Sequence, residues 1–229
     1  GRRGGGWRGG EGAMAPSRRG RSRKAGGRKG GSVRAKGEAK AAETVGQLLE
    51  DAEDNVLFER FDKALELLAR AHGMEPGNVE VMETLGTVLA EVGRVDEAVG
   101  MFSKAIEGRP DAGHEKYMYL SQLVEGEPAI HHASKGCEIL RAEVARGGGV
   151  EEKTQLCRAL CSVVELRMNY ADPASLGDEA VRSLLEAEQH DPQSPEPQQV
   201  LASLYVEQGK AEQARACLRR SMSLWAKGP

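Results

Sequence analysis

The sequence predicts an all-α protein in which about five helical hairpins follow a basic N-terminal tail. From about Thr44 onward, apolar residues recur every three or four positions, which is the spacing of one face of an α-helix. A second observation is a period of 34 residues in this part of the chain. The third is an aromatic content of only 4 %, which disfavours β-sandwiches and barrels. No run approaches about 18 apolar residues, so no transmembrane helix and no membrane partner are expected.

The first 40 residues differ from the rest in charge. They hold 13 Lys and Arg against 2 Glu, whereas residues 41–229 hold 19 Lys and Arg against 33 Asp and Glu. They also hold 13 of the 29 glycines, so we expect residues 1–40 to form a disordered tail and residues 41–229 to form the folded domain. Clustered basic residues are typical of nuclear import signals and RNA-contacting arms, with a solvated linker as the alternative. The predicted import residues are Arg18, Arg19, Arg21, Arg23 and Lys24.

Small and apolar residues recur at fixed offsets through the domain. Ala64, Leu68, Ala71 and Pro76 return 34 residues later as Ala98, Phe102, Ala105 and Pro110. The same spacing recurs in Ala180, Leu184, Ala187 and Pro192, and then in Ala214, Leu218 and Ser221. This is the tetratricopeptide (TPR) pattern of two antiparallel helices, in which small residues allow close crossing and proline ends the second helix. The sequence therefore predicts a TPR-like solenoid whose first helices line a concave groove.

Five units can be assigned in order along the chain. They begin near Val45, Val79, His114, Thr154 and Pro195. The second helix of the third unit is predicted over 129–140, and a glycine run at 147–149 separates the third and fourth units. The fourth unit has about seven extra residues, 170–177, between its helices.

The two ends of the chain raise separate expectations. Met14 is followed by Ala15, Pro16 and Ser17, so we expect Met14 to be the native start.

The last helix, over about 211–225, places several large apolar residues near the end of the sequence. We expect an exposed apolar patch there, which a further repeat fills in the complete protein. Its members are Leu218, Met222, Leu224 and Trp225.

The places on the first helices that usually face a TPR groove hold mainly glutamates. The predicted partner-binding residues are Glu53, Glu80, Glu83, Glu91, Glu115, Met118, Tyr119, Glu125 and Glu165. Glu196 and Glu207 occupy the same places in the fifth unit, Leu49, Leu57 and Leu166 are further apolar members, and Arg158 is the basic one. An acidic concave surface selects a basic, extended partner. The alternative is a solvated acidic face, since Glu is also a good helix former.

The residue patterns of common catalytic and metal sites are missing from the sequence. The glycine runs are not followed by the strand and helix that phosphate-binding loops require. Cys157 and Cys161 are four residues apart on one helix, where packing explains them, and His131 and His132 have no carboxylate at a catalytic spacing. We therefore expect no enzyme activity, cofactor, metal or small-molecule substrate.

Several stretches resemble one TPR family more closely than the general repeat does. They are 116–123 (KYMYLSQL), 135–140 (KGCEIL), 158–168 (RALCSVVELRM), 201–204 (LASL) and 218–225 (LRRSMSLW). Together they resemble the dedicated assembly chaperones of the large-subunit ribosomal protein L-four. The resemblance implies binding of the basic loop of newly made L-four, entry into the nucleus through an import receptor, and release on the 60S precursor. It also implies residence in both nucleus and cytoplasm. The alternative is a general TPR scaffold or RNA-processing assembly factor whose tail contacts RNA.

Overall fold

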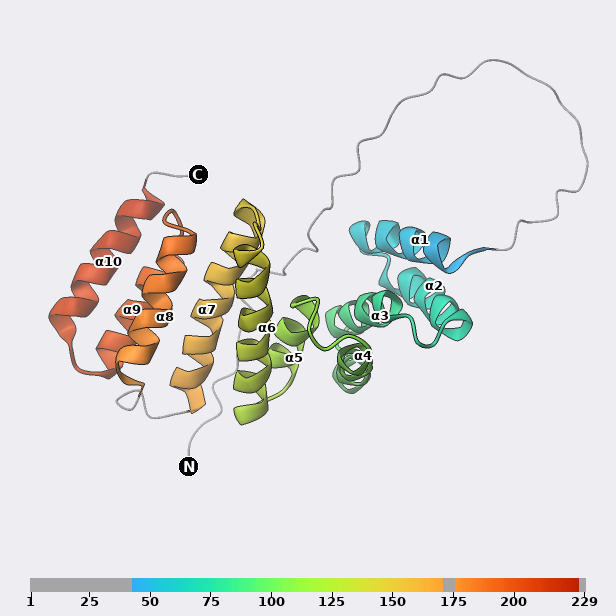
Figure 1. Cartoon of the computed structure of the whole chain (residues 1–229), viewed down its shortest axis with the longest axis horizontal. Helices are drawn as coiled ribbons and strands as arrows, with labels where there is room; N and C mark the ends of the chain where they lie inside the picture. The colour runs from blue at the N-terminus through green and yellow to red at the C-terminus, as the bar shows by residue number, and fades with distance from the viewer. Residues whose placement is uncertain (1–42, 171–175, 227–229) are drawn as a thin grey trace, which may run out of the picture. The chain divides into compact units, whose positions relative to one another are not determined.

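The computed structural model describes residues 43–170 and 176–226, and these residues form helices joined by short connections (Figure 1). Within these ranges lie five helical hairpins, each of two helices that pack closely on one another. The helices are α1 (Val45–Leu57), α2 (Phe61–Met74), α3 (Val79–Glu91), α4 (Val95–Gly108), α5 (Glu115–Leu123), α6 (Glu127–Ala145), α7 (Val150–Tyr170), α8 (Gly177–His190), α9 (Glu196–Glu207) and α10 (Ala211–Trp225). The predicted all-α repeat fold is confirmed. The boundary of the tail at residue 40 lies outside the described residues and stays a prediction.

Two helix boundaries differ from the prediction in the third and fourth hairpins. α6 runs to Ala145, five residues past the predicted end, because Gly147 provides the turn that ends it. The Gly147 φ is +100°, and the amides of Gly147 and Gly148 donate to the carbonyls of Val144 and Glu143, which is the Schellman arrangement. α7 begins at Val150, earlier than predicted, since the Glu152 carboxylate accepts the Gly149 amide at 2.8 Å and caps the helix.

The turns within hairpins use a residue in the left-handed region. Gly93 and Gly209 have φ values of +77° and +72° at equivalent places after α3 and α9. In the first hairpin the same place is taken by Glu59, whose φ is +56°. The left-handed conformation is unfavourable for a residue with a Cβ, so this turn is strained where the others are not.

The apolar core continues from one hairpin to the next. One cluster extends from α1 to α5 and a second from α5 to α9, and α5 contributes Leu120 to the first and Met118 to the second. Close crossing requires the small residues that the period predicted. A Cβ on Gly86 would lie 2.9 Å from the Phe102 ring, so only glycine fits between α3 and α4 there.

The predicted apolar patch on α10 is exposed. Leu218, Met222 and Trp225 are 46 %, 70 % and 69 % exposed, and Leu224 is half-buried. None of the helices in the described part of the chain has the length and apolar character needed to cross a membrane.

Candidate functional site

The first helices of successive hairpins are neighbours in two groups. α3 contacts both α1 and α5, and α7 contacts α9. In the first group, the predicted residues Glu53, Glu80, Glu91 and Glu115 are exposed, and Tyr119 is half-buried beside them. We call these five residues the first-helix surface. It brings together side chains from α1, α3 and α5.

Carboxylates from α1 and α3 converge at one end of this surface. The pKa of Glu53 is raised above its usual range, first because the carboxyl group is partly buried, and then because Glu80, Glu50 and Asp54 lie near it. All the charges named in this shift are negative. Like charges at close range oppose ionisation, so this end of the surface would be stabilised by a cation.

Tyr119 lies at the other end of the surface, near Glu91 and Glu115. Its ring stacks on Phe102 with centroids 5.2 Å apart, which fixes the side chain against the core. Burial raises the pKa of its hydroxyl group, a hydrogen bond with Thr87 opposes this, and the charges of Glu91 and Glu115 raise it further. Glu91 and Glu115 therefore both lie near the Tyr119 hydroxyl group.

A second acidic group lies on α7 and α9. Burial raises the pKa of Glu165, and the pKa of Glu196 is raised by burial and then by Glu165. Arg158, the basic residue predicted for this position, opposes the shift at Glu196. This pair is therefore partly balanced by a cation of the chain itself.

Two predicted groove residues, Met118 and Leu49, are wrong in their placement. Met118 is only 3 % exposed and its sulfur lies beneath Gly136, so it packs between α5 and α6 and presents nothing to a partner. Leu49 is also buried, in the core cluster that extends from α1 to α5. Glu125 is exposed in the turn two residues after the end of α5, and its role as a partner-binding residue stays a prediction. Leu57 is exposed as predicted, and Leu166 is half-buried against the core.

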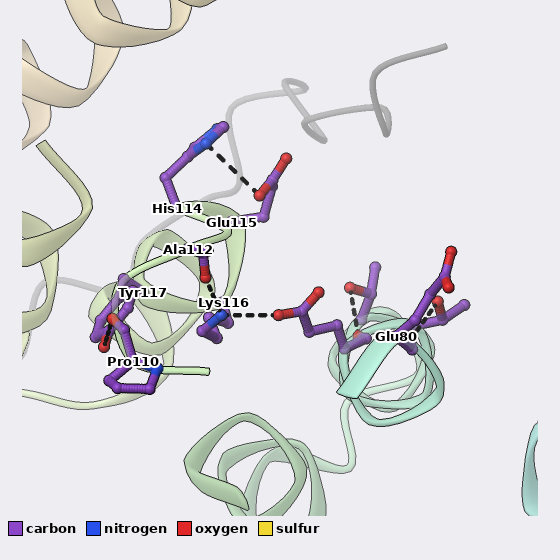
Figure 2. Close-up of polar contacts among 10 residues, drawn as sticks. Glu80, Pro110, Ala112, His114, Glu115, Lys116 and Tyr117 are labelled. Atoms are coloured by element: carbon purple, nitrogen blue, oxygen red, sulfur yellow. Dashed lines mark hydrogen bonds and ion pairs between the residues drawn. The ribbon is translucent and has the colours of Figure 1, made fainter. Parts of the chain in front are cut away.

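Lys116 lies beside the first-helix surface but was not among the residues predicted from the sequence. Its side chain is fully buried, and its Nζ atom donates to the Glu83 Oε1 atom at 2.8 Å and to the Ala112 carbonyl (Figure 2). Glu83 was predicted to bind a partner, but its carboxylate is engaged by Lys116 and is half-buried. The sequence did contain a signal, since Lys116 shares a helix face with Leu120 and Leu123, which lie four and seven positions later.

The remaining candidates are soon placed. Cys157 and Cys161 are fully buried in the core beside α9, as the packing interpretation predicts. Within the described residues, no three His, Cys, Asp or Glu side chains are grouped as a metal site would require. The predicted import residues Arg18, Arg19, Arg21, Arg23 and Lys24 lie outside the described residues.

The stacked hairpins define the class of this protein. A tetratricopeptide repeat model matches residues 55–116 and 177–222, and it covers parts of the first three and last two hairpins. The described part of the chain has the tetratricopeptide-repeat fold.

Comparison with individual proteins confirms the resemblance predicted from the sequence. The chain is 32 % identical over 189 residues to the "Probable assembly chaperone of rpl4" of Schizosaccharomyces pombe. The aligned residues cover 78 % of this chain and 55 % of that relative. It is 28 % identical over 215 residues to the protein with the same description from Emericella nidulans, which covers 86 % of the chain and 52 % of that relative. The chain thus spans about half the length of these curated relatives.

A solved structure shows the same fold. The structure titled "Assembly Chaperone of RpL4 (Acl4)", residues 1–338, superposes with a TM-score of 0.72 and 24 % identity. The superposition covers 82 % of this chain and 77 % of that one.

Proposed function

We propose that this protein is a non-enzymatic, dedicated chaperone that binds a basic ribosomal protein, L-four of the large subunit, on its first-helix surface. It keeps the client soluble and escorts it to the nucleus for assembly of the 60S subunit. Support for the client comes from the relatives described as assembly chaperones of rpl4. Support for the binding site comes from the charges of the structure itself.

The observation that supports this site is a set of carboxylates without a cation. Among the described residues, Glu53, Glu80 and Glu91 make no ion pair with Lys or Arg, and Glu115 meets only His114, at 3.6 Å. Their mutual repulsion falls when a positively charged chain lies across α1, α3 and α5. A field of one sign also speeds the encounter with an oppositely charged partner.

The experiment is a solubility assay with the ribosomal protein itself. Purified L-four, diluted from denaturant into buffer, should scatter light strongly alone and remain clear with an equimolar amount of this chain. L-four that lacks its basic internal loop is the matched control and should gain little. Equal aggregation with and without the chain would contradict a chaperone role.

The tail supports the proposal of nuclear delivery. Clustered Lys and Arg in an extended chain fit the acidic grooves of import receptors. A reporter fused to residues 1–43 should accumulate in the nucleus, and replacement of the five predicted import residues by Ala should leave it in both compartments. Nuclear accumulation that persists after the replacement would contradict the assignment.

The second candidate function is an RNA scaffold, which the 13 Lys and Arg of the tail favour. The full chain would then bind RNA with an affinity that falls steeply with salt, because each neutralised phosphate releases counterions. A variant lacking residues 1–40 would lose this binding. The chaperone proposal expects instead that the same variant still protects L-four from aggregation.

A further inference from the structure

The buried Lys116 lies beside α3, and two oxygen atoms, of the Glu83 carboxylate and the Ala112 carbonyl, contact its ammonium group. Gly113, with a φ of +74°, brings the loop after α4 close to the charge, and a Cβ there would lie 3.1 Å from the Lys116 Nζ atom. Tyr117 holds the same loop by donating its hydroxyl to the Pro110 carbonyl at 2.7 Å. Figure 2 shows Lys116 between the Ala112 carbonyl and α3. A fully buried Lys is rare unless it is paired, and here Glu83 is its pair.

The pairing divides the acidic residues of α3 into used and unused charges. Glu83 forms an ion pair with Lys116. Glu80, which precedes it on α3, and Glu91, which follows it, make no ion pair within the described chain. Glu80 acts together with Glu53, and Glu91 acts on Tyr119 together with Glu115. The surface thus has two acidic ends with a neutral centre.

We propose that Lys116 determines the specificity of this surface: it restricts binding to chains with two groups of Lys or Arg separated by an uncharged stretch. The proposal rests on the proposed function, since it deepens the recognition of a basic client. A client cation opposite Glu83 would meet a carboxylate that is already neutralised and an ammonium behind it. It would lose its hydration there without gaining a partner.

The helix geometry sets the separation of the two groups. Glu80 and Glu91 are eleven residues apart, which is close to three turns, so they lie on one face at about 16 Å along the axis. An extended chain rises about 3.3 Å per residue, so this distance corresponds to about five residues. The preferred client segment therefore has basic groups about five residues apart.

The test measures binding of the full chain to four labelled peptides. Three have equal charge and carry two Lys pairs separated by zero, three or eight Ser and Thr residues, so that the centres of the pairs are two, five or ten residues apart. The fourth has the three-residue spacer with a Lys at its centre. We expect the three-residue spacer to bind at least threefold more tightly than the other two spacers of equal charge. We expect the central Lys to change the affinity by less than twofold.

The variant Lys116→Met separates a specificity role from a structural one. Glu83 keeps 29 % of its side chain exposed, so a freed carboxylate can reach a ligand, and the central Lys should then tighten binding at least threefold. The matched control is the double variant Glu83→Gln with Lys116→Met, in which both charges are gone and the central Lys should again have little effect. Circular dichroism checks the fold of each variant, and the measurements on the unaltered chain stand without them.

Two results would overturn the proposal. One is an affinity that follows total peptide charge and ignores spacing. The other is a central Lys that tightens binding equally in the unaltered chain and in Lys116→Met. In both cases L-four itself would still bind, whereas failure of the proposed function would show as loss of binding to L-four and to every peptide.

Discussion

Charge reversal on the first-helix surface should abolish client binding without disturbing the fold. The perturbation is the triple variant Glu53→Lys, Glu80→Lys and Glu91→Lys. All three side chains are exposed and none has an ion pair with Lys or Arg in the described structure, so no internal contact is lost. Glu83 is left unchanged because reversing it would place a second ammonium against the buried Lys116.

The magnitude follows from the number of charges and their exposure. An exposed ion pair contributes about 0.2–1 kcal/mol, and a reversal replaces this attraction with a repulsion of similar size. Three reversals therefore cost about 1–6 kcal/mol, and each 1.4 kcal/mol is about tenfold in affinity. We expect at least a tenfold weaker affinity at low salt. The difference should shrink toward about 1 M salt, where the Debye length falls to about 3 Å.

The assay is fluorescence anisotropy with the labelled basic loop of L-four at two salt concentrations. The control reverses Asp62, Asp96 and Glu107, which are exposed carboxylates on the second helices α2 and α4. It changes the net charge by the same amount. An affinity within twofold of the unaltered chain, or an equal loss in both triple variants, would show that the first-helix surface is not the binding site.

Three further predictions concern stability and exposure. Glu59→Gly should raise the free energy of unfolding by about 0.5–1 kcal/mol in urea titrations, because glycine relieves the left-handed turn; Gly93→Ala should lower it. The pKa of Glu53 is raised in the folded protein, so its ionisation lowers stability as the pH rises through that pKa; Glu53→Gln should therefore raise the Tm at about pH 7 and have little effect at about pH 3. In a Trp7→Phe variant, Trp225 fluorescence should be red-shifted and readily quenched by acrylamide, whereas shielded emission would contradict an exposed patch.

The repeat period was sufficient to predict the fold because it reports the packing itself. Ala64 and Ala98 are small and Leu68 and Phe102 are large at the same places, since the same helix crossing recurs every 34 residues. The five hairpins follow from such positions, and Gly93 and Gly209 form the turns after α3 and α9. The carboxylates Glu53, Glu80 and Glu91 are exposed on α1 and α3, as expected for the helix places that the period assigned to them.

Prediction failed where a place on a first helix is used for packing. Leu49 on α1 and Met118 on α5 occupy expected groove places, but both are buried in the core. The partner of Lys116 is 33 residues away in the sequence, and the pairing depends on the loop at Gly113. Such a contact between two hairpins leaves no periodic pattern, and only the structure shows it.

The most direct test of the central claim is hydrogen exchange of the full chain with and without L-four. Client bound on the first-helix surface should protect amides of α1, α3 and α5, with the largest effect near Glu53, Glu80 and Glu91. The second helices α2 and α4 should change little. Protection confined to α2 and α4, or no protection at saturating client, would contradict the account.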